Sequence, residues 1–115
     1  MAVNIVSFAY SRPETQWGIS RAQKYDVRPL PNPHSIPALR PLTGKHPDVQ
    51  KFVRDSVKFS VVMGPILARI RDGDFIAFGC HGGIHRSVAC AEILAVTCRE
   101  RGFPYTIEHH GLDKS

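Results

Sequence analysis

The sequence lacks any hydrophobic run long enough to cross a membrane. Its longest apolar stretch, residues 59–67, is interrupted by a serine, a glycine and a proline, whereas a bilayer span requires about 20 apolar residues. The amino-terminal segment 1–10 also lacks the basic flank and the small-residue cleavage site of a signal peptide. These absences exclude a membrane-spanning protein and favour a cytoplasmic location.

Cysteine is scarce, and the three that are present, Cys80, Cys90 and Cys98, show no paired spacing. An odd number without such pairing is typical of a reducing compartment and not of a disulfide framework. His81 and His85 span a turn, and no acidic or cysteine partner completes a set of metal ligands. The sequence therefore predicts no metal and no other cofactor.

Length and charge narrow the functional classes. The chain has 115 residues, of which 43% are hydrophobic and 22% charged, and these values predict one globular domain over residues 1–115. The net charge is +5, and arginine outnumbers lysine. Because the planar guanidinium suits phosphate recognition, the charge favours phosphorylated small molecules or nucleic acid as partners. A generic basic surface remains the alternative interpretation.

Hydrophobic patterning predicts alternating strands and helices. The expected strands are residues 3–10, 25–28, 75–78 and 105–107, and a helix is expected from Asp48, kinked or divided at Gly64-Pro65. A second helix is expected from His85 or Arg86 to Cys98. This order is typical of a small three-layer, Rossmann-like α/β domain with a short parallel or mixed sheet.

A proline-rich segment separates the second expected strand from the first helix. Residues 29–47 contain six prolines, which forbid a regular helix or a central strand. Such a segment is either a disordered linker or an ordered loop held by specific contacts, and its composition leaves both readings open.

The motif that carries chemistry follows the third expected strand. Residues 79–87 read G-C-H-G-G-I-H-R-S and lead into the second helix. Glycines at such a turn let successive backbone N–H groups form an anion-binding nest, and the helix N-terminus adds partial positive charge. Arg86 is suited to bind an oxyanion, and Ser87 to cap the helix or to donate a hydrogen bond to Cys80. A phosphate-binding loop is therefore predicted at this helix N-terminus.

The same residues allow an enzymatic alternative. The spacing Cys80-x5-Arg86 matches the phosphate loop of cysteine-dependent phosphatases, in which a thiolate attacks phosphorus. Such an enzyme also needs a general acid, and Asp26 is the attractive candidate. The catalytic set would be Cys80, Arg86 and Asp26, but a small buried residue at a strand end is the simpler role for Cys80. The interpretation that leads is therefore a non-catalytic one.

Three segments together resemble one known family. They are D-V-R-P-L-P-N-P-H at residues 26–34, L-R-P-L-T-G at residues 39–44, and the loop at residues 79–88. In this order they resemble the C-terminal domain of the RapZ family of RNase adapter proteins, and the likeness covers nearly the whole chain.

The resemblance implies a regulatory domain that senses a phosphorylated metabolite, an amino-sugar phosphate such as glucosamine-6-phosphate. With the loop analysis it gives the predicted ligand-binding set His34, Cys80, His81, Gly82, Gly83, His85, Arg86 and Ser87. The predicted supporting residues are Asp26, Arg28, Asn32 and Arg40. The resemblance also implies RNA binding as an RNase adapter and assembly into homo-oligomers.

The chain departs from the family pattern in three places. It contains no G-x-x-x-x-G-K-[ST] loop, so it is expected to be a stand-alone domain without the family's N-terminal nucleotide-binding domain. His81 and Ile84 replace a threonine and a lysine of the family loop, which shifts ligand preference. The tail, residues 109–115, has one lysine where the family's tail is rich in basic residues. The candidate RNA contacts are Arg28, Arg40, Arg99 and Arg101.

Overall fold

The computed structural model describes residues 1–112 and contains one four-stranded parallel sheet in the order β2-β3-β1-β4. The strands are β1 (Val3–Ala9), β2 (Gln23–Asp26), β3 (Phe75–Cys80) and β4 (Tyr105–His109). The α-helices are α1 (Pro47–Arg54), α2 (Val57–Arg69) and α3 (Arg86–Glu100), and two short 3-10 helices are η1 (Pro13–Gln16) and η2 (Pro33–Ser35). The predicted α/β class is confirmed, and the sheet is parallel throughout the described chain.

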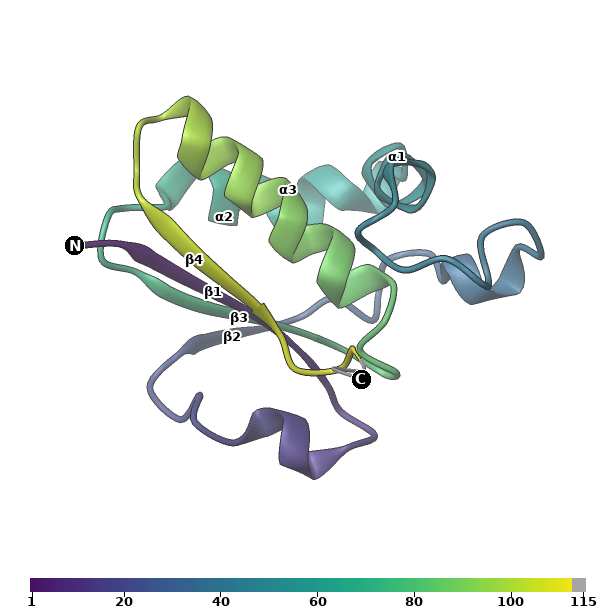
Figure 1. The fold of residues 1–115 in the computed structure, drawn as a ribbon. Helices are drawn as coiled ribbons and strands as arrows, with labels where there is room; N and C mark the ends of the chain where they lie inside the picture. Colours follow the sequence, from purple (N-terminus) through teal and green to yellow (C-terminus); the bar gives the residue numbers. More distant parts are fainter. Residues whose placement is uncertain (113–115) are drawn as a thin grey trace.

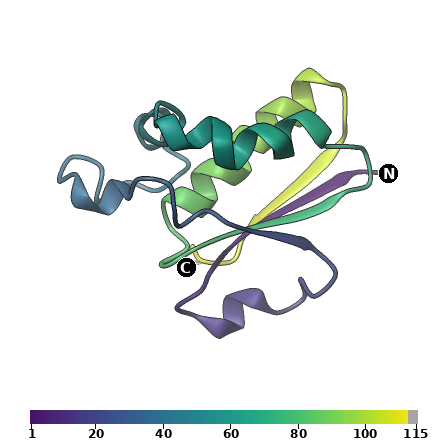
Figure 2. The same cartoon turned by 180° about the vertical axis from the view of Figure 1, so that it is seen from behind.

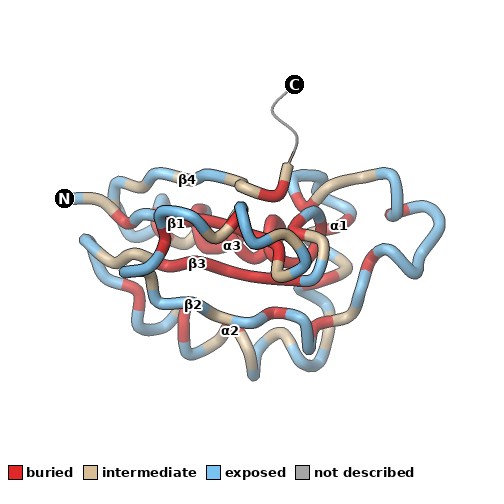
Figure 3. The backbone as a smooth tube through the Cα atoms, turned by 90° about the horizontal axis from the view of Figure 1, so that it is seen from below, coloured by how far each residue is buried: buried red, intermediate tan, exposed pale blue. Residues whose placement is uncertain are grey.

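The elements form three layers of unequal thickness. All three α-helices cover one face of the sheet, whereas the segment between β1 and β2, with η1, crosses the other face (Figures 1 and 2). The larger apolar core lies between the sheet and the helices, and a smaller cluster around Phe8 and Ile19 lies under the opposite face. Burial is therefore greatest along β1, β3 and α3, in the middle of the molecule (Figure 3).

The expected division at Gly64-Pro65 is wrong, because both residues lie inside the continuous helix α2. The break occurs earlier, between Arg54 and Val57, where Ser56 accepts a hydrogen bond from the Lys58 N–H and caps α2. The apolar periodicity predicted one helix across this region, but the Ser56 cap begins a separate helix there. Pro65 removes only one backbone donor, and α2 continues past it to Arg69.

The proline-rich segment is an ordered loop, so the linker alternative is excluded. The Asn32 side chain accepts from the His34 N–H at 3.1 Å and begins η2. The Arg40 Nε donates to the His34 carbonyl at 2.8 Å and closes the following turn. These local bonds replace the regular hydrogen bonding that proline prevents.

Gly44 fastens this segment to the glycine-rich loop that follows β3. Its N–H donates to the Ile84 carbonyl at 2.8 Å, and a Cβ at Gly44 would lie 2.3 Å from the Ala89 nitrogen. Only glycine permits so close an approach of two backbones.

No helix within residues 1–112 is long and apolar enough to cross a membrane. The carboxyl-terminal tail named in the sequence analysis comprises residues 109–115, and residues 113–115 lie outside the described part of the chain.

We predict opposite effects for alanine at two glycines. Gly44→Ala forces backbone movement at α3 and should lower the free energy of unfolding by at least about 2 kcal/mol. Gly64→Ala meets no atom within 4 Å inside α2 and should raise it by about 0.5–1 kcal/mol. Urea denaturation measures both, and equal stabilities for the two variants would contradict the close approach at Gly44.

Candidate anion-binding site

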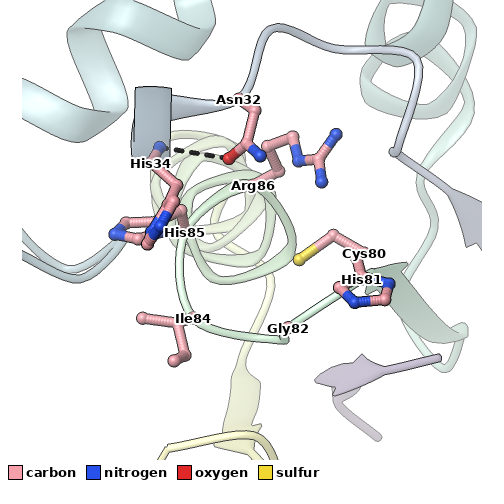
Figure 4. A pocket seen from close by; sticks show the side chains of 8 residues that line it. All are labelled: Asn32, His34, Cys80, His81, Gly82, Ile84, His85 and Arg86. Atoms are coloured by element: carbon pink, nitrogen blue, oxygen red, sulfur yellow. Dashed lines mark hydrogen bonds between the residues drawn. The ribbon is translucent and has the colours of Figure 1, made fainter. Parts of the chain in front are cut away.

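A cavity of about 290 Å³ opens at the carboxyl ends of the strands. It lies between the loop after β3, the proline-rich loop and the N-terminus of α3 (Figure 4). It is lined by Asn32, His34, Cys80, His81, Gly82, Ile84, His85 and Arg86. Ligands of open α/β sheets bind at this edge, so the position agrees with the predicted phosphate loop.

The carbonyl groups of the loop after β3 point away from the cavity. The carbonyl of Cys80, the last residue of β3, accepts from the Tyr10 N–H at 2.9 Å. The His81 carbonyl accepts from the Ser11 N–H and hydroxyl at 3.1 and 2.7 Å. The Gly82 carbonyl accepts from the Arg12 Nη2 at 3.2 Å, and the Ile84 carbonyl accepts from the Gly44 N–H at 2.8 Å. In a trans peptide the carbonyl and the next N–H point in opposite directions. The amides that follow these carbonyls, those of His81, Gly82, Gly83 and His85, therefore point away from the donors that hold the carbonyls.

None of the N–H groups of residues 81–85 donates a hydrogen bond to another group in the described chain. Backbone donors that lack an intramolecular acceptor are available to an anion. The N-terminus of α3 begins at the next residue, and no side chain caps it. This loop consequently presents a row of unused donors and a positive helix end at one wall of the cavity.

The two central glycines have different tasks. Gly83 has a φ of +69°, and a Cβ there would lie 2.8 Å from the Ala9 Cβ, so this residue faces β1 and does not line the cavity. Gly82 lines the cavity, and a Cβ there would meet no atom within 4 Å. Gly83 therefore shapes the loop, while Gly82 leaves room in front of it.

Arg86 joins the glycine-rich loop to the chain after β2. Its Nη1 donates to the Arg28 carbonyl at 2.7 Å and to the Leu30 carbonyl at 3.3 Å, and the residue is only 9% exposed. The other two nitrogens of Arg86, Nε and Nη2, donate no hydrogen bond within the described chain. Because no buried side-chain nitrogen there lacks a partner, these two nitrogens are in contact with solvent. Since Arg86 lines the cavity, part of its charge is available there.

The other polar side chains around the cavity are histidines and an amide. Rings of His34 and His85 lie 6.2 Å apart, and the His85 Nε2 contacts the Arg40 carbonyl at 3.2 Å. No carboxylate lines the cavity, and no group of three or more acidic, histidine or cysteine side chains among residues 1–112 could hold a metal. The lining therefore suits an anion and disfavours a cation.

Asp26 and Arg28 form a pair beside the cavity and do not line it. The two Asp26 oxygens accept from the Arg28 Nε at 2.9 Å and Nη2 at 2.7 Å, and the guanidinium stacks on the Tyr10 ring at 4.1 Å. The hydrogen bond from Arg28 lowers the pKa of Asp26 below its usual value. Asp26 is consequently held ionised, a poor state for a general acid.

Ser87 is fully buried and contacts the end of β3. The Cys80 Sγ donates to the Ser87 Oγ at 3.2 Å, whereas the N-cap of α3 is His85. Ser87 therefore does not cap α3, and its expected contact with Cys80 is present with the thiol, not the hydroxyl, as the donor.

Two residues near the site were missed by sequence reasoning: Arg12, which holds the Gly82 carbonyl, and Gly111, which packs directly against Gly83. Ile84, which was expected to shift ligand preference but was left out of the ligand-binding set, lines the cavity. No local sequence pattern indicated Arg12 or Gly111. Arg12 contacts Gly82, 70 residues along the chain, and Gly111 contacts Gly83, 28 residues away.

A second polar cluster lies away from the cavity, between β1, β4 and α3. The Ser7 Oγ contacts the His109 Nδ1 at 2.6 Å, and the His109 Nε2 contacts Glu92 at 2.7 Å. Burial lowers the pKa of His109, and the hydrogen bond with Glu92 opposes this shift. Ser7 is fully buried, so the cluster fastens β4 to the sheet and offers no accessible nucleophile.

The four arginines predicted to contact RNA do not form one patch. Arg28 and Arg40 lie at the cavity end of the sheet, where their backbone carbonyls contact Arg86 and His85. Arg99 and Arg101 lie at the other end of α3, a helix of 15 residues that spans roughly 20 Å. The Arg99 Nη2 also donates to the Tyr105 hydroxyl at 2.8 Å.

Comparison with known proteins gives a consistent result. The model of the RapZ C-terminal domain family matches residues 1–113. A nucleotide-binding protein of Symbiobacterium thermophilum is 36% identical over 126 residues, which cover 97% of this chain and 40% of that protein. One from Xanthomonas campestris is 38% identical over 117 residues, 90% of this chain and 40% of its own length. The chain thus spans about two fifths of the length of the curated relatives it matches.

We predict that Arg12 positions the loop without touching a bound anion. Arg12→Met removes the donor to the Gly82 carbonyl, so inorganic phosphate should bind about tenfold more weakly by calorimetry, and Arg12→Lys should recover part of the loss. Arg21→Met, at an exposed arginine elsewhere, is the matched control for lost charge. Equal affinities for Arg12→Met and Arg21→Met would show that the Gly82 carbonyl needs no anchor.

Proposed function

This chain belongs to the RapZ C-terminal domain family, and from that premise we propose that it is a non-catalytic regulatory domain that binds a phosphorylated metabolite. The observation that carries the proposal is the set of unused N–H groups on His81, Gly82, Ile84 and His85, residues that line a cavity with no carboxylate in its lining. A phosphate group fits these donors because several of its oxygens can accept hydrogen bonds from neighbouring backbone N–H groups at the same time.

The size of the cavity supports a small ligand. Its volume of about 290 Å³ is at the lower end of the range for small-molecule sites, which suits a phosphorylated sugar better than a dinucleotide. Glucosamine-6-phosphate is the specific ligand we propose, with its phosphate on the glycine-rich loop. Asn32, His34 and His85 are then positioned to contact the sugar hydroxyls.

The catalytic alternative has less support. The Cys80 thiol and Arg86 both line the cavity, as a phosphatase requires. However, Arg28 occupies both oxygens of Asp26 and keeps this carboxyl ionised, so it has no proton for a leaving group. Binding without turnover is the function that these contacts favour.

The wider role is proposed from the family. We take residues 1–115 as one domain that acts in the cytoplasm, associates with copies of itself and binds RNA weakly as an RNase adapter. In this proposal RNA contacts the domain at two places and not in one basic groove. The reason is that one pair, Arg28 and Arg40, lies at the opposite end of α3 from the other, Arg99 and Arg101.

We predict that one charge placed in the cavity abolishes ligand binding. At Gly82 a side chain meets no atom within 4 Å, so Gly82→Asp and Gly82→Asn should both fold. A like charge about 4 Å from the phosphate costs about 4 kcal/mol near a protein surface. Gly82→Asp should therefore bind glucosamine-6-phosphate at least about 100-fold more weakly than Gly82→Asn.

Calorimetric titration with glucosamine-6-phosphate, inorganic phosphate and glucosamine provides the test. Absence of binding by both phosphate compounds would refute the anion site, and binding of phosphate alone would refute the amino-sugar assignment. Release of phosphate that disappears in Cys80→Ser would instead establish the enzyme.

We predict that RNA binding is weak and falls steeply with salt, because phosphate contacts release counterions. Replacing both Arg99 and Arg101 with glutamine should lower the slope of log affinity against log salt by about 2. Filter binding from low to physiological salt measures this slope. Undetectable binding at the lowest salt would contradict the RNA role and leave metabolite binding untouched.

A further inference from the structure

The three cysteines occupy two kinds of environment. Cys90 and Cys98 lie on α3 within the apolar core, and burial raises the pKa of each thiol. Their thiolates are disfavoured, so both should be inert to oxidants. Cys80 is also buried, with 2% of its surface exposed, but it ends β3 and its exposed part lies in the lining of the candidate anion cavity.

The surroundings of Cys80 suit a negatively charged sulfur group. Its Sγ lies 3.2 Å from the Ser87 hydroxyl, which can rotate to donate a hydrogen bond to an anion. His81, Gly82, Ile84 and His85, whose N–H groups are unused, and the nine-tenths buried Arg86 line the same cavity. In Figure 4 the sulfur points into the space between Gly82 and Arg86. The donors that would hold a phosphate therefore also surround this thiol.

We propose that Cys80 is a peroxide-sensitive modification site whose oxidised form occupies the anion cavity and blocks the ligand. The Cys80 thiolate attacks one oxygen of hydrogen peroxide, so that an S–O bond forms and the O–O bond breaks. Hydroxide leaves and takes up the proton that the thiol released, giving water. Sulfur loses two electrons and peroxide gains them, and the sulfenic acid releases its own proton to solvent to give a sulfenate.

The consequence is competition for one set of donors. The sulfenate oxygen lies at the wall where the ligand's phosphate would accept from the loop, so the two anions exclude each other. This step rests on the proposed anion site. Bound phosphate should protect Cys80, and a thiol reductant should restore binding because sulfenic acids are reversible.

The experiment uses the chain with all three cysteines present, so that Cys90 and Cys98 serve as internal controls. The reduced protein is treated with hydrogen peroxide and dimedone, with or without inorganic phosphate, and the adducts are mapped by peptide mass spectrometry. At least ten times more adduct is expected on Cys80 than on either control, with less when phosphate is present. Comparable labelling of all three thiols, or labelling of a core thiol first, would overturn the proposal.

Phosphate titrations before and after oxidation test the consequence. Peroxide should weaken phosphate binding at least tenfold in the natural sequence and in Cys90→Ala, with recovery after dithiothreitol. In Cys80→Ser, peroxide should change nothing relative to the untreated variant. If oxidised Cys80 leaves phosphate affinity unchanged, the blocking step is wrong.

The two proposals fail in different ways. If the reduced chain binds no phosphate while Cys80 is labelled selectively, the proposed function fails and the modification site stands. If phosphate binds while Cys80 resists peroxide, the anion site stands and this inference fails.

Discussion

The trans peptide plane is the constraint on which the whole site depends. It obliges each loop carbonyl and the following N–H to point in opposite directions, so donors can face a cavity only where carbonyls are held elsewhere. Here Tyr10, Ser11, Arg12 and Gly44 hold those carbonyls from outside the loop. The residues directly after β1 and Gly44 of the proline-rich loop thus shape the candidate anion site, although none of them lines the cavity.

Charge at the cavity is arranged by the same contacts. Arg86 uses one nitrogen to secure two carbonyls of the chain after β2 and keeps its other donors free. Asp26, beside the cavity, is paired with Arg28, which the Tyr10 ring supports. The cavity lining itself contains Arg86 and no carboxylate.

Local patterns in the sequence were sufficient for the α/β class, the start of α3 and the glycine-rich loop at the cavity, but they left the sheet parallel or mixed. Apolar periodicity and the loop glycines encode these features within a few residues. Asn32 and His34 were expected at the site from the family resemblance. The break before α2 was misplaced because a Ser56 cap outweighed Gly64-Pro65, and β2 lies two residues earlier than expected. Arg12 and Gly111 could not be predicted, since their roles exist only after distant segments meet.

The pairing of β1 with β4 determines when, during synthesis, the glycine-rich loop gains its support from the end of the chain. Ser7 and His109 are in contact although 102 residues separate them, and Gly111 then lies against the loop at Gly83. A nascent chain that has emerged only as far as α3 has the glycine-rich loop without this support. During synthesis the glycine-rich loop therefore gains this support only after β4 has been released, and contacts of such sequence separation form late and slowly.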